Sequence, residues 1–154
     1  MGDYFKVIST DPGEKDHCGI VIANGVGSSW DIEYIDAITK KQLFDILEKV
    51  SPEGTLLIYE DYKLYDSKKS AMVGNKFETV KVIGTMEYIC SRRNIDYIVS
   101  QTMNKKFFDN NKLKRMGLYT EVEHKRDAVR HLLYYLYFTA KLLPLADLVG
   151  KNDI

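Results

Sequence analysis

The chain has 154 residues, of which 45% are hydrophobic, and it carries 22 basic and 22 acidic side chains. This length suffices for one buried core but not for two, so we expect a single domain over residues 1–154. The composition excludes a disordered chain, a collagen-like repeat and a disulfide-rich scaffold.

The first third of the chain predicts three antiparallel strands followed by a helix. Segments of β-rich sequence cover residues 4–10, 18–23 and 29–35. Asn24-Gly25 is a strong signal for the hairpin turn between the second and third of these strands. Apolar side chains then recur at helical spacing over residues 39–50, and Ser51-Pro52 ends that pattern.

The rest of the chain alternates strands with helices. Apolar runs predict strands at residues 55–59 and 95–99. Helical patterns cover residues 68–93, 104–116 and 124–143. A loop also fits residues 104–116, and Pro144 ends the last helix. Gly74 and Gly84 interrupt the first of these helices, and close packing against another helix is one reason for such glycines. We predict the α/β class, with a mixed five-stranded sheet (three antiparallel strands, then parallel strands) flanked by helices.

The two cysteines and the apolar runs indicate a cytoplasmic protein. Cys18 and Cys90 have no CxxC partner, which favours reduced thiols over a zinc site or a redox pair. The start of the chain has no apolar signal-peptide run. The longest uncharged apolar run, residues 132–140, is far shorter than the roughly 20 residues that span a bilayer. We therefore expect no membrane association.

The zero net charge conceals two halves of opposite sign. Residues 1–61 contain 5 basic and 12 acidic side chains, whereas residues 62–131 contain 15 basic and 8 acidic ones. A basic surface beside an acidic pocket suits an enzyme that acts on a polyanion, because phosphates are attracted while carboxylates hold metal ions. A solvated surface also produces such asymmetry.

Acidic side chains stand at structurally coherent positions. Asp11 and Glu60 each end a predicted strand, and Asp127 lies in the first turn of the last helix, three residues after His124. Carboxylates brought together at one sheet edge repel one another unless divalent cations neutralise them, and oxygen-rich sites favour Mg²⁺ or Mn²⁺. The pattern predicts a metal site.

Each of these residues also has an ordinary structural explanation. Asp11 precedes Pro12-Gly13 and fits a turn. Glu60 fits a solvated strand end, and His124 fits a histidine that faces water near the helix start. A metal site explains better why all of these residues occur together at such positions.

Basic side chains cluster shortly before the last helix. They are Lys105, Lys106, Lys112, Lys114 and Arg115. We expect them to hold phosphates, with an affinity that falls as salt rises, and the exposed face of an amphipathic helix is the alternative. Lys68-Lys69 and Arg92-Arg93 fit solvated helix ends better.

Several other conspicuous side chains fit the interior of the protein better than a binding surface. His131 lies two turns after His124, and we interpret it as a hydrogen-bonded core or interface histidine. Trp30 and the aromatic residues at 134, 135, 137 and 138 are expected in the core or at a dimer contact, because the latter interleave with leucines at helical spacing.

Together these motifs resemble the RuvC-type Holliday-junction resolvases over residues 6–136. The motifs that carry the resemblance are Asp11-Pro12-Gly13 with Gly19, Leu57-Ile58-Tyr59-Glu60, and His124-Lys125-Arg126-Asp127-Ala128. The sequence is most similar to the compact, phage-encoded branch, in which an Asp-Ala-x-Arg-His ending recurs. The resemblance implies an RNase H-like fold, a homodimer, and divalent-metal-dependent cleavage of branched DNA, in the cytoplasm of a bacterial host if the chain is phage-encoded.

The resemblance assigns roles to individual residues. Asp11, Glu60 and Asp127 match the family's acidic metal ligands, and His124 matches a position that is Asp in some relatives and His in others. Two metal ions in the site would activate water and stabilise the leaving oxygen, with Asp11 shared between them. Tyr62 or Tyr65 would contact the junction, because the family's aromatic stands one place after Tyr62.

Three other functions remain open on the sequence. A flap or fork debranching nuclease needs the same metal site, and a binding module would grip junctions without cutting them. An actin-like ATPase shares the fold class and an Asp at the end of the first strand, but the chain lacks the second domain and the second phosphate-binding loop of such proteins.

Overall fold

A mixed five-stranded sheet forms the centre of the protein. The computed structural model describes residues 3–13, 17–60, 69–100 and 107–143, with the backbone alone for 69–77. The strands are β1 (Lys6–Pro12), β2 (Cys18–Val26), β3 (Ser29–Ile38), β4 (Thr55–Glu60) and β5 (Asp96–Ser100). Their order is β3-β2-β1-β4-β5, in which β1, β2 and β3 pair antiparallel and β1, β4 and β5 pair parallel. The predicted sheet is confirmed.

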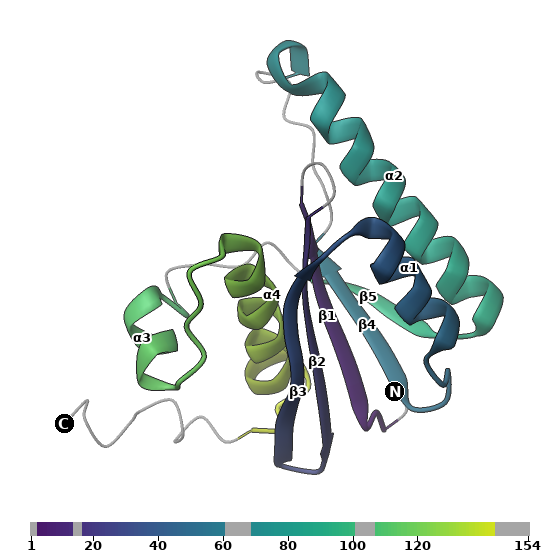
Figure 1. The fold of residues 1–154 in the computed structure, drawn as a ribbon. Helices are drawn as coiled ribbons and strands as arrows, with labels where there is room; N and C mark the ends of the chain where they lie inside the picture. The colour runs from purple at the N-terminus through teal and green to yellow at the C-terminus, as the bar shows by residue number, and fades with distance from the viewer. Residues whose placement is uncertain (1–2, 14–16, 61–68, 101–106, 144–154) are drawn as a thin grey trace.

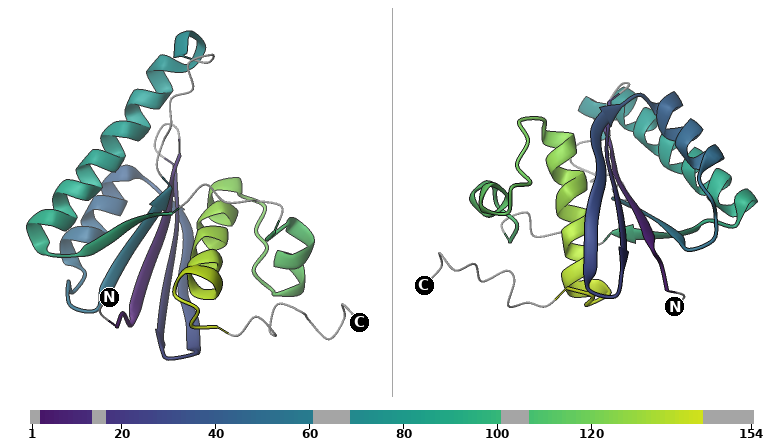
Figure 2. Two further views of the ribbon diagram at one scale, coloured as in Figure 1. Left: turned by 180° about the vertical axis from the view of Figure 1, so that it is seen from behind. Right: turned by 60° about the horizontal axis from the view of Figure 1, so that its bottom comes forward.

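Helices cover both faces of this sheet. The helices are α1 (Lys40–Lys49), α2 (Lys69–Arg93), α3 (Asn110–Arg115) and α4 (Glu123–Tyr134). Helices α1 and α2 lie on one face and α4 lies on the other, with α3 outside α4 (Figures 1 and 2). Within the described ranges, no helix has the length and apolar character needed to cross a membrane.

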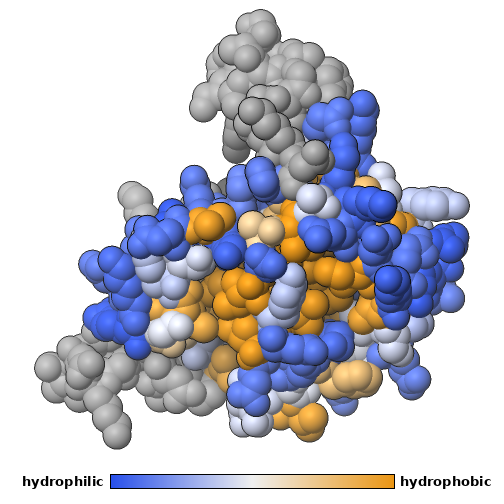
Figure 3. Space-filling view, viewed as in Figure 1, coloured by the Kyte–Doolittle hydropathy of each residue, from blue (hydrophilic) through white to orange (hydrophobic). Residues whose placement is uncertain are grey.

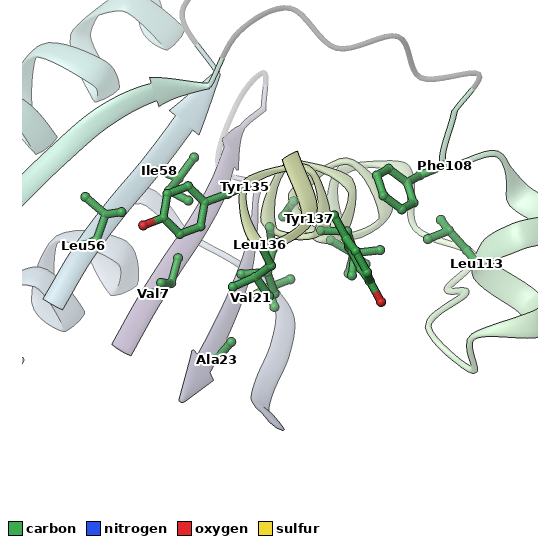
Figure 4. Close-up of a cluster of buried hydrophobic side chains, with 14 residues drawn as sticks. Val7, Val21, Ala23, Leu56, Ile58, Phe108, Leu113, Tyr135, Leu136 and Tyr137 are labelled. Atoms are coloured by element: carbon green, nitrogen blue, oxygen red, sulfur yellow. The ribbon is translucent and has the colours of Figure 1, made fainter. Parts of the chain in front are cut away.

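The pleat of the strands divides the apolar side chains between two cores. Ile8 and Leu57 point toward α1 and α2, where they pack with Leu43 and Met86. Their neighbours Val7, Leu56 and Ile58 point to the opposite face, where they pack with the end of α4 (Figure 4). In the space-filling view, hydrophilic side chains cover the outer side of α1, and hydrophobic surface gathers near the edge strand β3 (Figure 3). Side-chain alternation thus decides which strand residues face α4.

Helix α1 begins close to its predicted start because its first residues form a capping box. The hydroxyl of Thr39 accepts a hydrogen bond from the Gln42 backbone N–H at 3.1 Å. The Gln42 side chain accepts one in return from the Thr39 backbone N–H at 2.9 Å. Two backbone donors that the helix leaves open are thereby satisfied.

The predicted hairpin turn at Asn24-Gly25 is wrong, because both residues belong to β2. The turn lies at residues 27–28, where Gly27 has a φ of +59°. The strand continues past Asn24 because its side chain donates to Glu33 at 2.6 Å and the Gly25 N–H donates to the Phe5 carbonyl at 3.0 Å. Pairing with both neighbouring strands therefore outweighs the local turn preference of Asn-Gly.

The last helix is shorter than predicted. It ends as α4 at Tyr134 and continues as a π-helical segment, Tyr135–Thr139, rather than reaching residue 143. The Ala140 N–H bonds to the Tyr135 carbonyl at 2.8 Å, and Lys141 adopts a φ of +53° that ends the helix. Phe138, on this segment, makes an edge contact with Phe107 at 4.9 Å between ring centroids. Helix α3 forms only the second half of the predicted segment 104–116, whose first residues lie outside the described ranges.

Cys18 and Cys90 form no disulfide, in agreement with the predicted reduced thiols, and both side chains are fully buried. Burial raises the pKa of the Cys90 thiol to about 11. Because only the thiolate reacts readily, we expect a thiol-specific disulfide reagent at pH 8 to label the native protein slowly and the urea-unfolded protein at once at both cysteines. Fast labelling of both thiols in the native protein would contradict this burial.

Candidate functional site

Asp11 faces α4 because it shares the face of β1 that carries Val7 and Ser9. Ser9 donates a hydrogen bond from its hydroxyl to the Ala128 carbonyl at 2.7 Å, so β1 is tied to the first turns of α4. Two residues further along, the Asp11 carboxylate lies 3.0 Å from Nδ1 of His124. The structure therefore brings together two of the four predicted metal ligands, at the carboxyl end of β1.

Two glycines let the start of α4 come this close to the sheet. Gly19 pairs with Asp11 across β1 and β2, and a Cβ on Gly19 would lie 2.0 Å from the His124 carbonyl oxygen. A Cβ on Gly13 would lie 2.7 Å from Nε2 of the His124 ring. His124 can reach Asp11 only because neither position has a side chain.

We expect Gly19→Ala to destabilise the fold by about 1–3 kcal/mol, because the added methyl group forces the backbone of α4 outward. Gly84→Ala is the matched control. Although close packing was one expected reason for Gly84, a Cβ there meets nothing within 4 Å, so this exchange in α2 should stabilise by about 1 kcal/mol. Urea unfolding measures both changes, and a neutral Gly19→Ala would show that α4 does not press on β2.

The contact with Asp11 changes the electrostatics of His124. The hydrogen bond to Asp11 is the main cause that raises the pKa of His124, and partial burial opposes it. Since an ionised carboxylate only accepts, His124 donates from Nδ1 to Asp11. The imidazole is part exposed, so it is accessible from solvent at this sheet edge.

Glu60 faces α4 as well, and it meets a second histidine. Glu60 is the last residue of β4 and is paired with Ser100, the last residue of β5. Its carboxylate Oε2 lies 3.3 Å from Nε2 of His131, and Nδ1 of the same ring lies 2.7 Å from the Ser100 hydroxyl. His131 is 2% exposed, so its interpretation as a hydrogen-bonded core histidine is confirmed. Of its two partners, Glu60 is a predicted site residue.

Asp127 is buried and engages an arginine. Its Oδ1 accepts a hydrogen bond from Nη1 of Arg130 at 2.8 Å, and both side chains are buried. The same guanidinium donates from Nε to the Phe108 carbonyl and from Nη2 to the Asn110 side chain, each at 2.7 Å. Asp127 therefore neutralises the buried guanidinium of Arg130, and this guanidinium links α4 to the start of α3.

Exchanging Arg130 for methionine should cost about 3–5 kcal/mol of folding free energy, since Asp127 then loses its buried cationic partner. Adding Asp127→Asn to this variant should restore part of the loss, because the remaining side chain carries no charge. Thermal and urea unfolding of the two single variants and the double variant measure this coupling. Strictly additive effects would contradict the ion pair.

The four predicted ligands thus form separate pairs. Asp11 meets His124, Glu60 meets His131, and Asp127 meets Arg130. In the part of the chain that the structure describes, no three His, Cys, Asp or Glu residues lie close enough together to hold one metal ion. The expected single cluster is therefore not formed in this arrangement.

The chemistry of the Asp11 and His124 pair nevertheless fits a hard divalent cation. Oxygen and imidazole nitrogen are both accepted by Mn²⁺, and oxygen by Mg²⁺. Neighbouring ligands of an octahedral ion with bonds of 2.1 Å are about 3.0 Å apart, which matches the spacing of Oδ2 and Nδ1. The pair can supply two coordination positions once the shared proton has left.

The described basic residues lie on and near α3, as predicted, and two of them contact aromatic rings. Lys112 lies over the Phe107 ring at 4.1 Å, and Lys114 over the Tyr119 ring at 4.6 Å. Lys114 and Arg115 are exposed, whereas the side chain of the preceding residue, Leu113, is fully buried. Phosphate binding by these basic residues stays a prediction, and the predicted site residues Tyr62, Lys105 and Lys106 lie outside the described ranges.

Sequence patterns gave no role to several residues that hold this region together. Ser9 and Ser100 carry no motif, and only the fold shows their partners and that of Arg130. Arg126 and Arg130 stand in quoted motifs without an assigned role, and the Arg126 guanidinium faces the Tyr119 ring from 5.4 Å. The core interpretation of Trp30 and of the aromatic run is confirmed, because all pack in or against the core that α4 covers.

A search of protein-family models and of curated proteins finds no match to the chain. Among solved structures, it is similar to T. thermophilus RuvC in complex with Holliday junction substrate, with a TM-score of 0.61 and 12% sequence identity. The match covers 90% of this chain and 96% of the RuvC chain. At this identity the likeness concerns the fold, and it confirms the RuvC-like, RNase H-like architecture.

Proposed function

We propose that the chain is a structure-selective endonuclease that resolves Holliday junctions and related branched DNA with divalent metal ions, as one RNase H-like domain over residues 1–154. One observation carries this proposal. Asp11 and Glu60 lie at the carboxyl ends of adjacent parallel strands, on the face that α4 covers, and His124 contacts Asp11 at that edge. The RuvC-like fold supports the same conclusion.

Each residue has a role in this proposed reaction. Two Mg²⁺ or Mn²⁺ ions, when bound, would supply an activated water and stabilise the leaving oxygen of the phosphodiester. Asp11 would be shared between the two ions, Glu60 would hold one, and Asp127 with His124 would hold the other. A neutral histidine makes the site less negative than a fourth carboxylate would, which favours Mn²⁺.

The proposed DNA contacts come from the basic part of the sequence, residues 62–131. Lys112, Lys114 and Arg115 would bind phosphates, together with Lys105 and Lys106, and Tyr62 would contact the junction itself. A homodimer would place two active sites on opposed strands of a four-way junction. The sequence resemblance to the compact phage-encoded branch supports this mode of action, in the cytoplasm of the host.

A broader flap or fork debranching nuclease would use the same residues. The second candidate function is a module that binds branched DNA without cutting it. The salt bridge of Asp127 with Arg130 favours this alternative, because it occupies one oxygen of a predicted metal ligand.

The proposal predicts that Asp11→Asn and Glu60→Gln each reduce junction cleavage by roughly 10²- to 10³-fold, since several kcal/mol of metal-assisted stabilisation are lost. Junction binding in EDTA should be retained. The exposed residues Asp45 and Glu53 provide matched controls, because Asp45→Asn and Glu53→Gln remove the same charges away from this sheet edge. The substrates are end-labelled four-way junction, fork, flap and linear duplex, in EDTA, Mg²⁺ and Mn²⁺ separately.

Paired symmetric nicks on the junction alone would support the resolvase. Cleavage of forks and flaps as well would identify the broader debranching nuclease. Tight junction binding with no cleavage in either metal would overturn the nuclease and establish the binding module.

A further inference from the structure

His131 connects two strand ends through the only two polar atoms of its ring. Glu60 and Ser100 are register partners on the parallel strands β4 and β5, and both side chains point toward α4. His131 lies above them on α4, with Nδ1 2.7 Å from the Ser100 hydroxyl and Nε2 3.3 Å from Glu60. One buried side chain thus bridges the final residues of neighbouring strands.

The chemistry of the two partners determines where the imidazole proton lies. An ionised carboxylate has no proton to donate, so Nε2 of His131 must carry the hydrogen that faces Glu60. In the neutral ring Nδ1 is then an acceptor, and the Ser100 hydroxyl donates to it. Glu60 therefore selects the tautomer, and the Ser100 hydroxyl, which can donate or accept, donates to Nδ1 and fixes the orientation of the ring.

This arrangement distinguishes His131 from His124. The side chain of His131 is 3% exposed, whereas that of His124 is 37% exposed. Both nitrogens of His131 are committed to protein partners, so the ring acts as a donor to a ligand rather than as a ligand. The Glu60 side chain is 28% exposed at the end of β4, so one of its oxygens can be held while the carboxylate still reaches solvent.

We infer that His131, oriented by Ser100, is a positioning residue for Glu60: it holds one oxygen of the carboxylate on the α4 face of the sheet, where Glu60 would bind a divalent cation. The inference rests on the proposed function for the metal role of Glu60. The hydrogen-bonded chain from β5 through α4 to β4 is a property of the fold and can be measured separately.

The first test detects the tautomer without any metal or DNA. In protein with ¹⁵N-labelled histidine rings, the His131 spectrum at pH 8 should show a protonated Nε2 and an unprotonated Nδ1. His131→Gln identifies the signals by their loss, and Ser100→Ala should shift the Nδ1 signal, whereas Ser91→Ala on the exposed side of α2 should not. A protonated Nδ1 in the wild-type protein would overturn the inference.

The second test measures Mn²⁺ affinity by electron paramagnetic resonance in the absence of DNA. His131→Leu, which keeps the volume but removes both nitrogens, should weaken binding about 10- to 100-fold, as loss of partners behind metal ligands does elsewhere. His131→Gln should retain most of the affinity, because its amide can place an N–H near the position of Nε2. Unfolding midpoints and junction binding in EDTA show whether each variant is folded.

Loss of the metal role of Glu60 and loss of the positioning role of His131 alone give different results in these variants. Wild-type Mn²⁺ affinity in Glu60→Gln would overturn the metal role of Glu60 and with it the proposed function. Weakened binding in Glu60→Gln together with unchanged binding in His131→Leu would overturn the positioning role alone. Mn²⁺ affinity that is retained in His131→Gln but weakened in His131→Leu would support the positioning role, since a merely structural role does not require an N–H at the place of Nε2.

Discussion

The close packing of α4 against β1 and β2 is the contact on which both the second core and the candidate site depend. Gly19 leaves room for the helix backbone, and the Ser9 hydroxyl bonds to the Ala128 carbonyl. Residues two turns apart on α4 then lie over different strand ends. His124 reaches Asp11 on β1, and His131 reaches Glu60 on β4, so any displacement of the helix would alter both pairs together with the apolar packing.

The polar groups at this edge are arranged as pairs because burying a carboxylate costs free energy unless its oxygens are hydrogen-bonded or neutralised. Two of the acids contact histidines and the third contacts Arg130. These partners keep the carboxylates apart from one another. A divalent cation would have to compete with them, and the proton between Asp11 and His124 is the one whose removal makes two ligand atoms available at the spacing that an octahedral ion requires.

Most of the fold could be predicted from the sequence because its strands and helices have strong periodic patterns. All five strands, the start of α1 and the presence of α4 follow from apolar spacing and capping residues. Two of the differences arose where tertiary contacts outweigh local preference. Asn24 and Gly25 stay in β2 because both neighbouring strands bond to that strand, and the last helix ends early because residues after Thr139 turn back toward Leu136.

The sequence by itself determined the α/β architecture and the residues that stand at the strand ends and at the start of the last helix, since both depend on periodicity along the chain. It could not determine which side chains meet there. Only the tertiary structure decided that Asp127 would pair with Arg130 and that Ser100 and Glu60 would share His131, because these partners come from segments that are distant in sequence or have several possible neighbours. The physical reason is that strand order and helix packing, rather than local propensity, select the partners of buried polar groups.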